Sequence, residues 1–203
     1  MATPTRKRPL RVDAQRNRDR IIGAAHEAFA ELGLEVSMEE IARRANVGAA
    51  TLYRRFPSKQ QLLRAIFDTR LSELEPQIAA GFEMADPWEG LLAAMRALFE
   101  AQARNMAFVQ MLAQAGELTA LKSELRARVF DPLGELFARA QASGQVRADL
   151  DPHELPVLVR MVATTIGHDG RCPAAEVTAN WPRYLSLLAD ALRTPDPAVL
   201  PPR

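Results

Sequence analysis

Apolar residues recur along this chain at intervals of three and four, the spacing of a helix face, and no stretch alternates in the manner of a β-strand. The first apolar stripe ends at Gly33, a residue type that often terminates helices. Ser37 and Ser58 each stand three residues before Glu or Gln, which is the capping-box pattern of a helix start. Further starts combine an N-capping side chain with a nearby proline, at Asp86, Asp151 and Asn180. The pattern predicts an all-α fold, with a small N-terminal three-helix unit before a larger C-terminal helical unit.

Two prolines fall inside predicted helical stripes. Pro76 is expected to end or kink the helix that opens after Ser58. Pro132 lies within a long stripe that runs from Leu121 to Phe137, and we expect a kink or a break into two helices there. A separate short helix is predicted over residues 106–115.

The second and third predicted helices are separated by a short turn at residues 46–48, and the third, about residues 49–56, is short and basic. Gly48 is expected to make the turn tight, while apolar side chains pack on the first helix: Ile41, Ala45, Val47, Leu52 and Phe56. The outer face of the short helix would then be free to enter a DNA major groove, which admits one α-helix. The spacing alone fits equally well an ordinary helical hairpin with a solvated basic face.

Charge is unevenly distributed along the chain. Residues 1–60 hold 12 Lys and Arg against 7 Asp and Glu, whereas residues 61–203 hold 14 against 18. This asymmetry indicates that residues 1–60, and not the rest of the chain, bind a polyanion. Residues 1–13 are predicted to form a disordered basic tail, which either keeps the protein in solution or reaches into a DNA minor groove through residues such as Arg6, Lys7, Arg8 and Arg11.

The overall composition predicts a globular protein of the cytoplasm. Apolar residues make up 48% and charged residues 25% of the chain, and no apolar run has the length of a membrane-spanning helix. The basic N-terminus is followed by no apolar stretch, so no signal peptide is predicted. Cys172 is the only cysteine, which excludes an internal disulfide framework.

No catalytic residues, metal ligands or cofactors are predicted. His168 and Cys172 lie close together in a predicted loop, but no oxyanion-hole motif accompanies them. The three histidines, His26, His153 and His168, lack the spacing of metal ligands, and no glycine-rich phosphate or dinucleotide loop occurs. The sequence therefore does not favour an enzyme.

The run RDRIIGAAHEAFAELGLEVSMEEIARRANVGAATLYRRFPSKQQLLRAIF resembles the DNA-binding domain of the TetR (tetracycline-repressor-like) family, without gaps over about residues 16–70. Its distinctive pieces are AFAELG, EIA, VG, TLY and FPSK. The resemblance implies a DNA-binding domain over residues 14–74, with the helix-turn-helix at 37–56. It also implies that Thr51, Tyr53 and Lys59 touch the DNA backbone.

At four positions this sequence departs from the family's usual residues. Arg55 stands where the family often has a phosphate-contacting His, and it keeps a donor while adding a permanent charge. Gly48 replaces a common Ser, so an N-cap hydroxyl is missing. Ala49 and Ala50 replace larger or polar residues and could meet a thymine methyl group, while Arg54 adds further charge.

Farther along, GQVRADLDPHELPVLV and WPRYLSLLADALR resemble C-terminal segments of such regulators. The resemblance implies an effector-binding and dimerisation domain over residues 75–195, followed by a flexible tail over 196–203. An apolar effector pocket is predicted from Phe99, Phe108, Met111, Phe137, Met161 and Thr165, although these residues equally suit a plain core. A homodimer seam is predicted from Leu158, Val162, Tyr184, Leu188 and Leu192, which would otherwise cover the domain's own core.

The function implied by the resemblance is that of a sequence-specific transcriptional regulator. We expect a homodimeric repressor that binds an inverted-repeat operator in double-stranded DNA and is released by a small apolar effector. The alternative is an architectural or effector-independent DNA-binding protein, which would bind unrelated duplexes with similar affinity.

Overall fold

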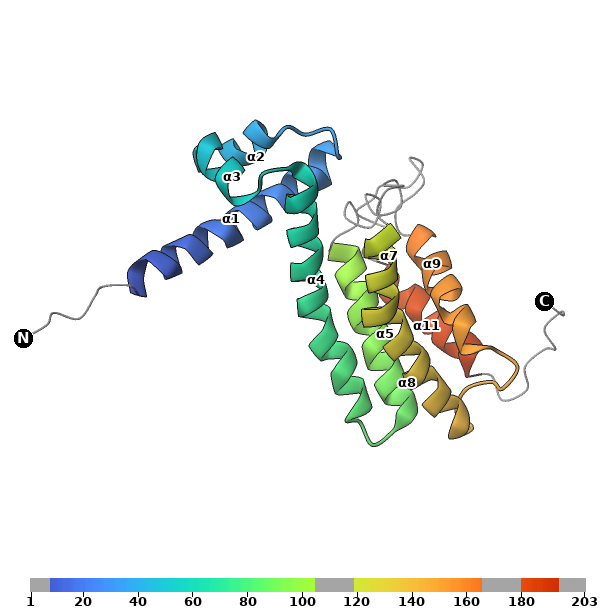
Figure 1. Ribbon diagram of the computed structural model, residues 1–203. Coiled ribbons are helices and arrows are strands. Elements are labelled where there is room, and N and C mark those ends of the chain that lie inside the picture. The colour runs from blue at the N-terminus through green and yellow to red at the C-terminus, as the bar shows by residue number, and fades with distance from the viewer. Residues whose placement is uncertain (1–7, 105–118, 166–179, 194–203) are drawn as a thin grey trace, which may run out of the picture. The chain divides into compact units, whose positions relative to one another are not determined.

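The computed structural model describes residues 8–104, 119–165 and 180–193, and every regular element within these ranges is helical (Figure 1). The all-α prediction is confirmed. The chain divides into two compact units, Met1–Thr69 and Arg70–Arg203. Within the described ranges, no helix combines the length and the apolar character needed to cross a membrane.

The first unit is built on the long helix α1 (Arg8–Leu32), with α2 (Met38–Arg44) packed on α1 and α3 (Ala49–Arg55) packed on α2 (Figure 1). Helix α1 begins at Arg8, inside the stretch 1–13 for which a disordered tail was predicted. It ends as predicted before Gly33, which takes the left-handed φ of 73°. The N–H of Gly33 donates to the Phe29 carbonyl at 3.0 Å, which satisfies one of the last carbonyls of the helix.

The core of the first unit joins one apolar stripe from each helix. Ile21, Ala25 and Phe29 of α1 are buried, as are Ile41 of α2 and Leu52 of α3. Helix α4 (Lys59–Phe82) opens after Ser58, whose Oγ accepts from the Gln61 N–H at 3.2 Å, and its first part adds further buried side chains, Leu62, Ile66 and Phe67. Burial of these apolar side chains stabilises the packing of α2 and α3 within the first unit.

Helix α4 passes through Pro76 and ends at Phe82, so of the two predicted effects of this proline, an end or a kink, the end is wrong. Pro76 itself is exposed, whereas Leu74 and Ile78 on either side of it are buried. A helix can continue through a proline when packing of its neighbours outweighs the loss of one backbone hydrogen bond.

The second unit is a helical bundle (Figure 1) in which α5 (Pro87–Arg104) and α8 (Asp131–Ala142) pack along each other. Helix α5 starts at the predicted signal, because Asp86 Oδ1 accepts from the Trp88 N–H at 2.9 Å. Facing side chains of the two helices form the buried core: Leu91, Met95, Phe99, Leu133 and Phe137.

The long stripe around Pro132 is broken, as predicted. It begins as α7 (Thr119–Leu125), passes into the π-helix η1 (Arg126–Phe130) and continues as α8. The N–H of Asp131 donates to the carbonyl of Arg126, five residues earlier. Pro132 lacks an N–H, and its ring would crowd the carbonyl four residues before it in a regular α-helix. The wider π turn in front of the proline relieves that crowding.

The last two described helices start where predicted. Asp151 Oδ1 accepts from the His153 N–H at 2.8 Å, and the Glu154 carboxylate accepts from the Asp151 N–H at 3.0 Å, which completes a capping box. This opens the short 3₁₀-helix η2 (Pro152–Glu154) and then α9 (Leu155–Thr165), while α11 (Trp181–Leu192) packs on α5. The helix predicted over residues 106–115 lies outside the described residues.

Candidate nucleic-acid interface

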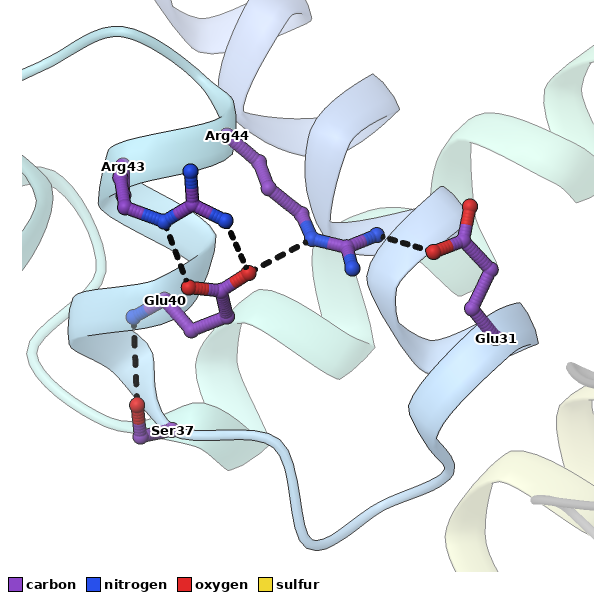
Figure 2. Close-up of polar contacts among 5 residues, drawn as sticks. All are labelled: Glu31, Ser37, Glu40, Arg43 and Arg44. Carbon is purple, nitrogen blue, oxygen red and sulfur yellow. Dashed lines mark hydrogen bonds and ion pairs between the residues drawn. The ribbon is translucent and has the colours of Figure 1, made fainter.

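Helix α2 is held at its start by Ser37 and along its length by ion pairs (Figure 2). The Ser37 hydroxyl accepts from the Glu40 N–H at 3.1 Å. The Glu40 side chain does not complete the capping box but turns to Arg43 and Arg44, so only the hydroxyl half of the predicted box forms.

Glu40 and Arg44 link α2 to α1. The Glu40 carboxylate accepts two bonds of 2.7 Å from Arg43 and one of 2.9 Å from Arg44. Arg44 also donates from Nη1 to Glu31 of α1 at 2.7 Å (Figure 2). Hydrogen bonds from Arg43 and then Arg44 lower the pKa of Glu40 to about 2. The network therefore adds a directional restraint on α2 to the apolar contacts beneath it.

The turn between α2 and α3 lies at residues 46–48, as predicted, and its left-handed residue is Asn46. Asn46 has a left-handed φ of 50°, a region that Asn tolerates better than most residues. Arg20 of α1 donates to the carbonyls of Ala45 and Asn46 at 2.6 and 2.9 Å. Gly48, with φ of −66° and ψ of 142°, is the extended N-cap residue of α3 and offers no side-chain cap, as predicted.

Helix α3 is anchored on one side and open on the other. Leu52 and the C-cap residue Phe56 are buried. The residues predicted to meet DNA lie on the remaining side of α3 and in the first turn of α4: Ala49, Ala50, Tyr53, Arg54 and Arg55 are exposed, and Thr51 and Lys59 are half-buried. The structure thus brings all seven predicted residues into one short segment supported by two apolar anchors.

Three of these side chains already make hydrogen bonds within the first unit. Tyr53 Oη donates to Glu39 Oε1 at 2.8 Å, and this bond is the main cause of a raised pKa of Tyr53 and a lowered pKa of Glu39. Arg55 Nη2 donates to the Ala14 carbonyl at 2.8 Å.

The third of these hydrogen bonds is made by Lys59, whose Nζ donates to the Leu34 carbonyl at 2.7 Å. Arg54, by contrast, makes no hydrogen bond or ion pair with any described residue. The partners Glu39, Ala14 and Leu34 were missed in the sequence, because they lie 14 to 41 residues away along the chain and no local pattern connects them.

The residues predicted for the effector pocket are scattered. Phe99 and Phe137 are fully buried in the core of the second unit. Met161 on α9 is 61% exposed and so lies away from that core. Thr165 is the last residue of α9, and Phe108 and Met111 lie outside the described residues.

The predicted seam residues lie on α9 and α11, mostly half-buried. Leu158, Tyr184 and Leu188 are half-buried, Leu192 is buried within the unit, and the side chain of Val162 is outside the described set. Other apolar side chains are more exposed on these helices: Val157 at 48%, Met161 at 61% and Leu187 at 57%.

These three exposed residues were not among those predicted from the sequence. A signal existed, because α9 is apolar on more than one side: Leu155 and Val159 are buried, while Val157 and Met161 stand on the outside.

Where side chains are described, no three His, Cys, Asp or Glu residues lie close enough together to hold a metal ion. Asp151 Oδ1 lies 3.6 Å from Nδ1 of the exposed His153 side chain. The segment with His168 and Cys172 lies outside the described residues.

Both units of the chain are similar to known proteins. Residues 21–66 match the family of bacterial regulatory proteins called the tetR family, and residues 86–193 match the C-terminal domain of SbtR-like transcriptional regulators. A crystal structure of a TetR transcription regulatory protein from Mycobacterium vanbaalenii aligns with a TM-score of 0.63 and 34% identity, covering 92% of this chain and 100% of that one.

Two curated relatives extend the similarity. The HTH-type transcriptional regulatory protein RaaS of Mycobacterium tuberculosis is 29% identical over 85% of this chain and 92% of its own length. The HTH-type transcriptional regulator SrpR of Pseudomonas putida is 26% identical over 71% of this chain and 70% of its own length.

Proposed function

Because the chain belongs to the TetR family of bacterial transcriptional regulators, we propose that it is a homodimeric repressor that leaves an inverted-repeat operator when a small effector binds. Members of this family and the curated relatives are DNA-binding regulators of transcription, not enzymes. Such a regulator acts in the cytoplasm, where bacterial DNA lies.

The observation that carries the DNA-binding part is the construction of α3. Its buried residue Leu52 and its C-cap residue Phe56 fix the helix on the first unit, and its other side presents small, hydroxyl-bearing and basic side chains to solvent. Ala49 and Ala50 permit close approach to the groove floor, where a thymine methyl group is a suitable partner. Thr51 and Tyr53 offer hydroxyls, and Arg54 and Arg55 offer charge, to the phosphates on either side.

Lys59 is placed to bind a phosphate at the start of α4. Its ammonium group carries three donors and uses one on the Leu34 carbonyl, which leaves two for a ligand. Lys59 is also the first residue of a 24-residue helix, whose N-terminal end favours an anion. The carbonyl contact holds the ammonium in place before DNA arrives, so less side-chain freedom is lost on binding.

A homodimer is supported by the exposed apolar face on α9 and α11. Val157 and Met161, one helical turn apart on α9, and Leu187 on α11 expose about half or more of their side chains in the single chain. A second copy related by a two-fold axis would cover the face and double the number of reading helices. Two copies of α3 would then contact half-sites about one helical turn of DNA apart.

The effector is proposed to bind in the second unit, beside the stripe formed by Met95 and Phe99 on α5. Gln102 continues that stripe, and its buried Oε1 has no hydrogen-bond partner among the residues that the structure describes. Leaving a buried acceptor unsatisfied costs about 1–3 kcal/mol. An apolar effector with one hydrogen-bond donor would satisfy this oxygen, and tighter binding to the DNA-incompetent state would shift the population away from the operator.

The deciding experiment is selection of bound sequences from a random duplex library, with the wild-type protein and with Tyr53→Ala. The proposal expects enrichment of an inverted repeat by the wild type, loss of that enrichment in Tyr53→Ala, and unchanged enrichment in the control Arg96→Ala, which alters an exposed cation on α5. Salt-sensitive binding without any enriched sequence would instead favour the architectural alternative.

The effector part has its own test. Apolar compounds should raise the melting temperature of the wild type, and compounds with a hydrogen-bond donor should lose much of this effect in Gln102→Leu. No stabilisation across a broad library would remove the effector from the proposal while leaving the DNA-binding part in place.

A further inference from the structure

Glu39 and Tyr53 face each other across the helix-turn-helix. Glu39 lies in the first turn of α2, Tyr53 lies on α3, and the phenol hydroxyl donates to Glu39 Oε1 at 2.8 Å. Both side chains are on the surface, and Tyr53 is 41% exposed. The contact therefore joins a carboxylate of α2 to a side chain that the proposed function directs at DNA.

A phenol has only one hydrogen to donate, and a phosphate oxygen only accepts. While the Tyr53 hydroxyl is bonded to Glu39, it cannot also donate to a phosphate. Arg55 and Lys59 differ, because each keeps further donors after bonding its backbone carbonyl. Of the three contacts, only the one with Glu39 competes directly with DNA.

Glu39 also places a negative charge on the surface that would approach a polyanion. The hydrogen bond from Tyr53 is the main reason that the pKa of Glu39 lies below its ordinary value, so the carboxylate is ionised at neutral pH. An exposed carboxylate next to a phosphate-binding side chain repels every phosphate that comes near, whatever the base sequence.

We propose that Glu39 restrains DNA binding by withholding the Tyr53 hydroxyl from phosphates, which weakens binding to every duplex and so keeps binding to non-specific DNA low. A matched operator compensates for the lost Glu39 bond through base contacts of α3, whereas a non-specific duplex offers only phosphates. The inference rests on the proposed DNA-binding function and adds to it a residue that suppresses background binding.

The test compares the full-length wild type with Glu39→Gln and Glu39→Ala on an unrelated duplex and on the selected operator. Both variants should bind the unrelated duplex roughly three- to fivefold more tightly, the effect of one unit charge about 4–6 Å away in water. Operator affinity should rise by a similar factor, because the carboxylate repels phosphates whatever the base sequence. The part of the gain that comes from charge should shrink at high salt.

A double-mutant cycle with Tyr53→Phe separates the two parts of the mechanism. At high salt, Glu39→Ala should still tighten binding to the unrelated duplex when Tyr53 is present, and it should have no effect in the Tyr53→Phe background. Unchanged or weaker binding of Glu39→Ala and Glu39→Gln to the unrelated duplex, with their thermal unfolding intact, would overturn the inference.

These measurements on an unrelated duplex do not need an operator. If the selection enriched no inverted repeat but Glu39→Ala still tightened binding, the proposed function would fail while the competition at Tyr53 stood. If the selection enriched an inverted repeat but substitution of Glu39 changed nothing, the proposed function would stand and the competition at Tyr53 would fail.

Discussion

Gly81 of α4 and Gly90 of α5 approach each other backbone to backbone. A β-carbon added to Gly81 would lie 2.7 Å from the carbonyl oxygen of Gly90, closer than real side chains come. Both residues are buried, and the pair lies on either side of the connection between the two helices. Their lack of side chains lets α4 and α5 pack at a distance that no other residue type would permit.

Gly81→Ala should therefore lower the free energy of unfolding by about 1–3 kcal/mol, because the added methyl group meets backbone that cannot move aside easily. Gly90→Ala should act in the same direction for the same reason. Urea denaturation of each variant measures the loss.

Gly134→Ala is the matched control for these two variants. Gly134 lies within α8, and a β-carbon there would meet only Pro152 Cβ at 4.0 Å, which is an ordinary contact. Replacing a helical glycine by alanine should then raise stability by about 0.5–1 kcal/mol. Equal effects of the Gly81 and Gly134 substitutions would contradict the close approach.

Gly48→Ser should stabilise the first unit by a few tenths of a kcal/mol, because serine would supply the N-cap side chain that α3 lacks. The backbone of Gly48 suits the change: its φ of −66° resembles the −76° of Ser37, the N-cap of α2. A β-carbon there meets only Thr51 Oγ1, at 3.9 Å.

Thermal unfolding measures this gain. Gly48→Ala is the control and should be less stable than the wild type, because alanine is a poor N-cap residue. If the alanine variant gained as much as the serine variant, general backbone stiffening and not capping would be the cause.

The ion pairs of Glu40 predict a particular dependence of stability on pH. The pKa of Glu40 in the folded protein is about 2, against an ordinary value of 4.5, because Arg43 and then Arg44 donate hydrogen bonds to its carboxylate. A lowered folded-state pKa contributes stability above the unfolded-state value, and this contribution disappears as the pH falls through the folded-state value.

The wild type should therefore be more stable than Glu40→Gln by a constant amount above about pH 5, and the difference should shrink as the pH falls and disappear below about pH 2. Urea denaturation at a series of pH values measures both curves. The stability of Arg44→Met should depend on pH less strongly than that of the wild type. Some pH dependence should remain, because Arg43 still donates hydrogen bonds to Glu40. A difference between wild type and Glu40→Gln that did not change with pH would rule out the ion pairs as its source.

Leu187→Lys should weaken dimerisation by roughly a hundredfold or more, because an unpaired ammonium group would be buried in the proposed seam. Size-exclusion chromatography with light scattering gives the molar mass over a dilution series. Met84→Lys is the control, since Met84 is 40% exposed but lies in the connection between α4 and α5. Equal behaviour of the two variants would place the seam elsewhere.

The features that could be predicted from the sequence are those with local causes. Ser37, Asp86 and Asp151 each bind a backbone N–H two or three residues away, so the pattern of residue types around each helix start was sufficient. Pro132 likewise affects the turn just before it. The proposed recognition helix α3 could be predicted for the same reason, because its buried anchors and its exposed basic residues lie within one short stretch of sequence.

Features that depend on how helices cross could not be predicted. Nothing near Lys59 in the sequence points to the Leu34 carbonyl, and nothing near Tyr53 points to Glu39. The left-handed φ of Asn46 was not predicted either, because glycine is the commoner residue at positive φ and the support for the asparagine comes from Arg20 on another helix. The sequence also could not show which apolar residues of α9 would be buried and which exposed, since several faces of that helix are apolar.

The π-helix before Pro132 has a consequence for comparing this chain with its relatives. A hydrogen bond in a π-helix joins residues five apart, as from Asp131 to Arg126, whereas in an α-helix it joins residues four apart. A π turn therefore contains one residue more than an α turn. A relative with an unbroken α-helix here would need one residue fewer to bring the same side chains inward. Residues 126–130 are thus the natural place for a one-residue gap in an alignment, and an alignment without that gap would pair inward positions of one protein with outward positions of the other.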